Sequence, residues 1–274
     1  MTGDPGLRAL RGAAARLEAA AAALPPPRPG QVSLGEEICD RLIDLAAARA
    51  AVARAAAGAA VPDEASGLVT ECVRWAVEDD TVRTRSRTVS PAPDGPSLEA
   101  VHALVTRLVT ALAAPERYDA VCGRLRAELG ERPEGRAAGA WDIADEALRG
   151  LAAVRAEWAG ADPAHTAAGG WVLVDRVARL QLTAALLAEA AARGGTEAEH
   201  LVNAARRHAW NWLRQPPPEA ATAVHVRRTG ELVAWIGAAE PVSAEPAPGG
   251  SVSGGSGAAG AVPVGSGRAG EGGA

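Results

Sequence analysis

The sequence predicts an all-α fold of about eight helices in one bundle-like unit. Apolar residues recur at spacings of three and four between residue 4 and about residue 215, as they do on one face of a helix. Capping residues precede these segments, and Pro or Gly ends them. From about residue 240 the chain consists mainly of Pro, Gly, Ser and Ala without periodicity, which predicts a disordered tail. We therefore expect a globular domain over 1–239 and a tail over 240–274.

Local start and stop signals place the individual helices. Asp4 precedes a Pro at the first helical position, which is a favoured way to open a helix. Ser33 with Glu36 forms a capping box, and so does Thr196 with Glu199. We expect eight helices. Their predicted ranges are 4–24, 33 to beyond 52, 63–78, 97–114, 115–130, 137–158, 166–193, and 196 to before 216.

Two segments alternate polar and apolar residues, as a half-buried strand does. The first is 81–89, with Arg83, Arg85 and Arg87 on one side, and the second is 224–236. The second segment contains an Arg-Thr-Gly-Glu stretch of the kind that forms hairpin turns. We expect a small β patch on the helical domain, with a helix as the alternative for the second segment.

Short matches at a common offset suggest an internal duplication. Asp40-Arg41 recurs as Asp175-Arg176, and Trp75 recurs as Trp210. The two related halves would cover about 4–114 and 137–239. The alternative is a chance alignment of Ala-rich helices, since much of the remaining identity is Ala on Ala.

The core has to be filled without phenylalanine, because the chain contains seven Trp, one Tyr and no Phe. We expect four of the tryptophans to lie in it. These are Trp75, Trp141, Trp171 and Trp212.

Composition and charge exclude several classes of protein. The formal net charge is −5, which disfavours a nucleic-acid backbone as partner, and none of the 28 basic residues is Lys, so lysine-based covalent chemistry is excluded. Three widely spaced cysteines without a C-x-x-C pattern predict reduced thiols in the cytoplasm. We find no signal-peptide pattern and no apolar run long enough to span a membrane.

Two E-x-x-H pairs, Glu99/His102 and Glu197/His200, raise the possibility of a metal site. Such pairs on bundle helices hold iron or manganese in ferritin-like proteins. Glu99 and His200, however, lie roughly 140° and 150° from the centres of the apolar stripes of their helices. Both pairs also lie in first helical turns, where Glu is favoured by the helix dipole. Capping therefore explains these pairs better than metal binding does.

The segment around Trp210 is a candidate binding face. Arg206, Arg207 and Arg214 lie three or four positions from it, opposite the apolar stripe of the same helix. A tryptophan among guanidinium groups can anchor a protein partner or an anionic ligand. The alternative is that Trp210 packs against a neighbouring helix.

A second basic cluster consists of Arg83, Arg85 and Arg87. Planar guanidinium groups suit phosphate or carboxylate ligands. The alternative is a solvated strand edge, where charged residues prevent aggregation.

No set of titratable residues converges on an inward face, so the sequence predicts no catalytic residue. Asp40, Asp44 and the pair Asp79-Asp80 lack the neighbours that an Asp-rich magnesium site needs. We expect a non-catalytic cytoplasmic helical protein that binds a protein partner or itself. The alternatives are a ferritin-like protein or di-metal enzyme that holds iron or manganese, and a binder of a small molecule in a pocket between helices.

Overall fold

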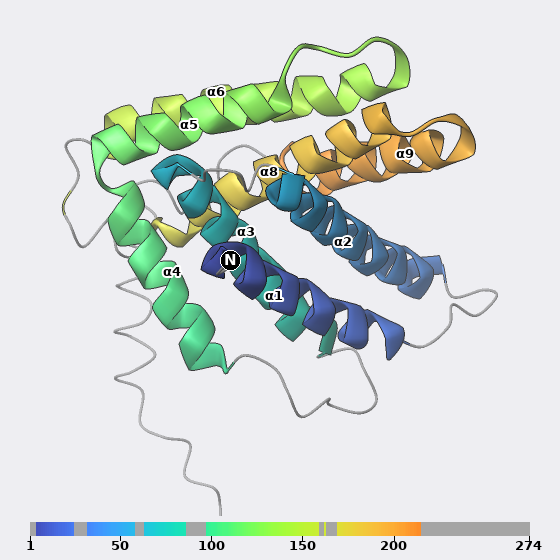
Figure 1. Cartoon of the computed structure of the whole chain (residues 1–274), viewed down its shortest axis with the longest axis horizontal. Helices are drawn as coiled ribbons and strands as arrows, with labels where there is room; N and C mark the ends of the chain where they lie inside the picture. The colour runs from blue at the N-terminus through green and yellow to red at the C-terminus, as the bar shows by residue number, and fades with distance from the viewer. Residues whose placement is uncertain are drawn as a thin grey trace, which may run out of the picture. The chain divides into compact units, whose positions relative to one another are not determined.

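The computed structural model describes residues 4–24, 32–57, 63–85, 97–158, 162 and 169–214. Within these residues the chain forms eight α-helices, one short 3-10 helix and no strand, which confirms the predicted all-α fold (Figure 1). The elements are α1 (Pro5–Ala22), α2 (Val32–Ala57), α3 (Glu64–Arg85), α4 (Leu98–Leu112), α5 (Pro115–Leu129), η1 (Gly135–Ala137), α6 (Ala138–Trp158), α8 (Trp171–Ala192) and α9 (Gly195–Trp212).

Side-chain caps begin three of the helices at the predicted places. Asp4 Oδ1 accepts a hydrogen bond from the backbone N–H of Gly6, and Ser97 Oγ accepts one from that of Ala100. Asp63 Oδ1 accepts from the backbone N–H of Ser66 at 2.6 Å. Each bond satisfies an amide that the helix itself leaves without a partner.

The predicted capping box at the start of α9 is wrong. The helix begins one residue earlier, at Gly195, and its N-cap is Gly194, which provides no side-chain cap. Gly195 has a φ of 62°, a left-handed conformation that glycine adopts without strain. The backbone turn between α8 and α9 therefore places Thr196 inside the first helical turn rather than before it.

Helix α8 runs through the middle of the domain and contacts α2, α3, α4, α5, α6 and α9 (Figure 1). Every residue from Val172 to Leu186 is buried except Asp175. A helix that is buried on all sides must satisfy every polar side chain that it carries. Helix α8 carries four buried polar residues, which are Arg176, Arg179, Gln181 and Thr183.

Leucine, valine and alanine fill most of the core, and tryptophan contributes less than expected. Trp75 is buried, and Trp141 and Trp212 are partly buried. The prediction for Trp171 is wrong, because this side chain is 44% exposed. Trp171 is the first residue of α8 and precedes the stretch that the other helices surround.

The predicted β patch is wrong where the structure describes it, because residues 81–85 continue α3. The hydroxyl groups of Thr81 and Thr84 donate to the carbonyls of Val77 and Asp80, one turn earlier. Both threonines are fully buried in this helical conformation. Residues 86–89, the segment 224–236 and the tail 240–274 lie outside the described residues. The internal duplication and the domain boundary at 239 stay predictions.

None of the helices in the described residues is by itself long and apolar enough to cross a membrane. Helices α4 and α5 meet that test only together, as a pair bent by 100°.

Two glycines associated with α5 provide a test of the described backbone. Gly130 ends the helix with a φ of 62°, whereas Gly123 lies inside it, and an added Cβ meets no atom within 4 Å at either position. We expect Gly130→Ala to lower the free energy of unfolding by about 1 kcal/mol, because alanine is strained at positive φ. Gly123→Ala should raise it by up to about 1 kcal/mol, because alanine favours a helix. Urea denaturation followed by circular dichroism measures both, and shifts of the same sign would contradict the assigned helix end.

Candidate functional site on helix α9

The outer face of α9 presents the most distinctive surface side chain of the described chain. Trp210 is 55% exposed, so it does not fill an interface between helices. The guanidinium carbon of Arg214 lies 3.4 Å from the centre of the Trp210 ring, as in a stacked cation–π pair. Arg214 therefore limits the movement of the indole while leaving much of it accessible.

A polar contact with α2 fixes this face of α9 in place. Arg207 Nε donates to Asp40 Oδ1 at 2.6 Å, and Asn211 Nδ2 donates to the same oxygen at 2.9 Å. Arg207 is thus matched by a carboxylate. Among the described residues, Arg206 and Arg214 form no ion pair. The predicted cluster of three arginines is therefore divided into one anchoring residue and two that keep an unmatched positive charge.

The opposite face of α9 is held by Trp212. Its Nε1 donates to Asp44 on α2 at 3.0 Å, and its ring lies 3.8 Å from the guanidinium carbon of Arg179 on α8. Arg176 Nη1 donates to the backbone carbonyls of Trp212 and Leu213, at 3.2 and 2.8 Å. The last turn of α9 is therefore tied to both α2 and α8, and its terminal carbonyls have donors.

Arg179 forms the centre of a buried ion-pair network. Its side chain is fully buried, and its two terminal nitrogens donate to the two oxygens of Asp80 on α3, at 2.6 and 2.7 Å. Its Nε donates to Asp175 at 3.1 Å. Burial alone would lower the pKa of Arg179, but the two carboxylates hold this pKa above its usual value. The guanidinium is therefore charged and bonded at all three nitrogens.

Asp44 adds a second buried carboxylate to this network. It accepts from Arg41 Nη1 at 3.0 Å, and the same arginine lies 3.9 Å from Asp80. Burial, and then the charge of Asp80, raise the pKa of Asp44 to about 7. Asp44 is thus the member of the network that gains a proton near neutral pH.

His208 lies on the same inner face of α9 and is buried. Its Nδ1 is 2.8 Å from the hydroxyl of Thr183 on α8, and its Nε2 has no hydrogen-bond partner among the described residues. Burial, and then the positive charge of Arg179, lower the pKa of His208 to about 3. The imidazole is therefore neutral at physiological pH.

The hydrogen bonds of this network link α2, α3, α8 and α9. Each of its carboxylates accepts hydrogen bonds from arginine, or from arginine and tryptophan. A buried ion pair of this kind mainly fixes the relative positions of the helices that carry it.

The second predicted basic cluster is only partly described. Arg83 pairs with Asp79 at 2.7 Å, and its guanidinium carbon lies 5.7 Å from the centre of the Trp212 ring. Arg85 is half-buried in the last turn of α3, and Arg87 lies outside the described residues. Arg83 thus lies beside the Trp212 ring, at the edge of the network around Arg179.

The predicted metal ligands lie on exposed helix faces. Glu99 and His102 are exposed on α4, and Glu197 and His200 are exposed on α9, where Glu197 pairs with Arg193 at 3.1 Å. Within the described ranges, no group of three or more His, Cys, Asp or Glu residues could hold a metal ion. The structure therefore does not bring these four residues into a site for iron or manganese.

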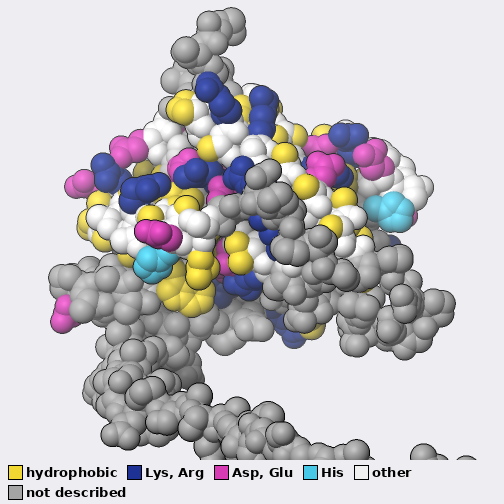
Figure 2. Space-filling model, turned by 90° about the horizontal axis from the view of Figure 1, so that it is seen from below, with side chains coloured by type: hydrophobic (Ala, Val, Ile, Leu, Met, Phe, Trp, Pro, Cys, Tyr) yellow, Lys and Arg dark blue, Asp and Glu magenta, His cyan; other side chains and the backbone are white. Residues whose placement is uncertain are grey.

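Acidic and basic side chains are interspersed across the described surface in Figure 2. Many of them form exposed ion pairs, such as Arg132 with Asp142 at 2.6 Å and Arg193 with Glu189 at 2.6 Å. On this face the charges therefore form no continuous basic stripe.

A cavity of about 220 Å³ lies between α6, α8 and the end of α9. Its wall is mainly apolar, with Leu151, Val154 and Leu173 among its residues, and Arg176 and Arg214 add positive charge. A cavity between helices is thus present, and the binding of a small molecule there stays a prediction.

No protein-family model, no curated protein and no solved structure matches this chain. The candidate site therefore rests on its own geometry.

The network around Arg179 was not predicted from the sequence. The prediction for Asp40, Asp44 and Asp79-Asp80 concerned only a magnesium site, and it did not foresee that arginines or Trp212 contact all of them. One signal was available in α8, where Asp175 and Arg179 lie four positions apart in a mainly apolar helix. A charged pair on a helix with apolar residues on every side indicates that the pair is buried and has a further partner elsewhere in the chain.

We expect Arg179→Met to lower the free energy of unfolding by about 3–5 kcal/mol, because it removes both hydrogen bonds that the buried Asp80 accepts from Arg179. The control is Arg132→Met, which breaks the exposed pair with Asp142 and should cost less than about 1 kcal/mol. Urea denaturation measures both variants. Similar losses for the two would show that the pair of Arg179 and Asp80 is not a buried one.

Asp44 should make stability depend on pH in a defined direction. Its pKa is raised from 3.8 to about 7 in the folded chain, so the folded state binds more protons than the unfolded state between these values. The contribution of Asp44 to stability is therefore fully present below pH 4 and is lost as the pH rises through 7.

His208 acts in the opposite direction, since its pKa is lowered from 6.5 to about 3 and its contribution is lost as the pH falls. The comparison of Asp44→Asn with the wild type separates the two effects. We expect the stability advantage of the wild type over the variant to shrink as the pH rises from 4 to 7, measured by urea denaturation at several pH values. A constant difference would show that Asp44 titrates normally.

Proposed function

We propose that the protein is a non-catalytic helical protein that binds a protein partner through the outer face of α9. The observation that supports this proposal best is Trp210, which is more than half exposed and is stacked against Arg214. Tryptophan and arginine are among the residue types that are enriched where the binding energy of protein interfaces is concentrated.

The rigidity of the face supports the proposal. Arg207 and Asn211 hold α9 to Asp40 on the outer side, and Trp212 holds it to Asp44 and Arg179 on the inner side. A side chain that is already ordered in the free protein loses little conformational entropy on binding. Trp210 is ordered by Arg214 and sits on a helix that is fixed from two sides.

The charge of the face favours an acidic partner. Arg206 and Arg214 flank Trp210 and have no carboxylate partner among the described residues. Asp40, the neighbouring carboxylate, is already neutralised by Arg207. We therefore propose that the partner presents an apolar group for Trp210 and at least one carboxylate for the two arginines.

Paired tryptophan variants test this proposal. The full chain is immobilised, proteins retained from a lysate of its source are identified, and their affinities for purified variants are measured. We expect Trp210→Ala to weaken binding of the partner by about 30-fold or more, the loss typical of a central interface residue. Arg214→Glu should weaken binding as well, because it removes the stacked guanidinium and repels an acidic surface.

Trp171→Ala is the matched control, because Trp171 is 44% exposed but lies at the start of α8. It should leave the affinity unchanged. Light scattering on the same proteins measures self-association. Retention of the same proteins at the same affinity by Trp210→Ala, or a dimer that Trp210→Ala dissociates, would contradict the proposal of a foreign partner.

A further inference from the structure

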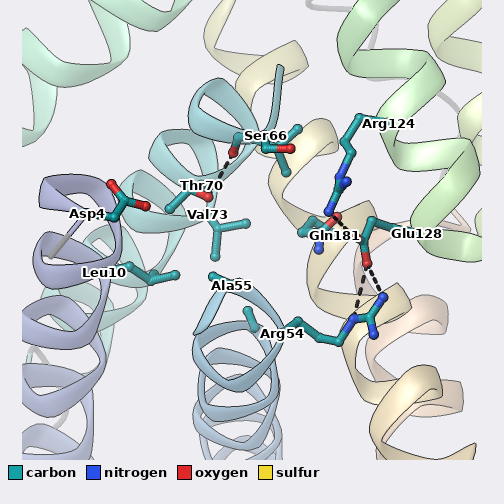
Figure 3. A pocket seen from close by; sticks show the side chains of 12 residues that line it. Asp4, Leu10, Arg54, Ala55, Ser66, Thr70, Val73, Arg124, Glu128 and Gln181 are labelled. Carbon is teal, nitrogen blue, oxygen red and sulfur yellow. Dashed lines mark hydrogen bonds and ion pairs between the residues drawn. The ribbon is translucent and has the colours of Figure 1, made fainter. Parts of the chain in front are cut away.

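A small pocket and a larger cavity border helix α8, and their walls differ in chemistry. The small pocket lies where α1, α2, α3, α5 and α8 meet, and its volume is about 50 Å³ (Figure 3). Two arginines and the carboxylates of Asp4 and Glu128 line it, and the buried Oε1 of Gln181 in its wall has no hydrogen-bond partner among the described residues. The pocket has room for roughly three or four water molecules, so water suits it.

The larger cavity, between α6, α8 and the end of α9, has a volume of about 220 Å³. Buried apolar side chains from all three segments form most of its wall, among them Leu151, Val154, Val172, Leu173 and Leu213. Water is a poor occupant of such a space, because a buried water molecule needs two to four polar partners. An apolar cavity of about 150 Å³ holds a benzene molecule, so this cavity has room for a somewhat larger apolar body.

Arg176 brings a buried positive charge to the wall of this cavity. The residue is 8% exposed, and its Nη1 donates to the backbone carbonyls of Trp212 and Leu213, which fixes the guanidinium at the end of α9. Burial lowers the pKa of Arg176, and the charge of Asp175 offsets this effect only in part. A negative charge in the cavity therefore stabilises the protonated guanidinium.

Arg214 adds hydrogen-bond donors to the same wall. Its guanidinium is stacked on the Trp210 ring, which occupies one flat face and leaves the N–H groups at the edge able to bind both oxygens of a carboxylate. Glu146 is the only carboxylate among the described residues of the wall. Because Glu146 is exposed, solvent screens its charge more than that of the buried Arg176. The wall therefore favours an anion.

We propose that this cavity binds a small carboxylate with an apolar body of about the size of a benzene ring, with 3-phenylpropionate as the representative of this class. The ring lies against Leu151, Val154 and Leu173. The carboxylate accepts hydrogen bonds from Arg214, and the charge of Arg176 attracts it. This proposal does not depend on the proposed docking face of α9, although Arg214 belongs to both.

Two matched probes separate the contributions of the charge and of the apolar body. 3-Phenylpropanamide keeps the ring and lacks the charge, whereas acetate keeps the charge and lacks the ring. Ligand-observed NMR titrations of the full chain compare them with 3-phenylpropionate. We expect 3-phenylpropionate to bind with a dissociation constant of about 1 mM or below, and each of the other two to bind about tenfold more weakly or not at all. No measurable binding of 3-phenylpropionate, or equal affinity of either other probe, would overturn the proposal.

Gly150 offers a way to fill the cavity. It lies in α6 and lines the cavity, and an added Cβ meets no atom within 4 Å. Gly150→Leu should therefore occupy part of the cavity while the helix is kept, because leucine favours a helix more than glycine does. We expect the affinity for 3-phenylpropionate to fall about tenfold or more in this variant.

Gly139→Leu is the matched control, because Gly139 lies in the same helix but outside the cavity, and an added Cβ there also meets no atom within 4 Å. It should bind 3-phenylpropionate like the wild type. Unchanged affinity of Gly150→Leu, or an equal loss in both variants, would contradict the assigned site. If Gly150→Leu does not fold, the comparison of the three probes on the wild type still decides the question.

Discussion

The fully buried guanidinium of Arg179 constrains the arrangement of the central helices. A charge inside a protein is tolerated when every hydrogen-bonding group has a partner, so α3 must present Asp80 to α8 and the indole of Trp212 must cover the remaining face. Asp80 lies near the end of α3, and the helix continues past it with Thr81 and Thr84 buried. The pairing thus explains why α3, α8 and α9 share one polar centre inside an otherwise apolar core.

The network around Arg179 and the small pocket beside Gln181 lie on different sides of this framework. Successive positions of a helix are 100° apart, so Gln181 points nearly opposite to Arg179 along α8. Arg179 faces α3 and α9 and thereby supports the helix that presents Trp210. Gln181 faces the pocket at the ends of α2 and α5. Helix α8 therefore borders the supporting network on one side and the small pocket on the other.

Local sequence signals predicted the helices well, but they could not predict polar contacts between residues that are far apart in the chain. Asp4 and Ser97 cap their helices through neighbours two or three residues away, so the sequence alone was enough to place those starts. The exposed position of Trp210 also agrees with its predicted place opposite the apolar stripe of its helix.

Arg179 and Asp80, in contrast, are 99 positions apart, and no spacing rule relates them. Residues 81–85 alternate polar and apolar side chains, as a strand does. This pattern contains no information on the hydrogen bonds that Thr81 and Thr84 donate to carbonyls of the preceding helical turn. Gln181 gave no signal, since a lone Gln in an apolar helix can have a partner or lack one.

The central claim is that contacts of Trp212 with Asp44 and Arg179 hold the last turns of α9 and so order the face around Trp210. Hydrogen–deuterium exchange of the full chain, compared with Trp212→Leu, tests it most directly. The account predicts faster exchange of amides in the second half of α9, with α4 and α5 unchanged. Unchanged exchange in α9, or an equal increase in every helix, would contradict it.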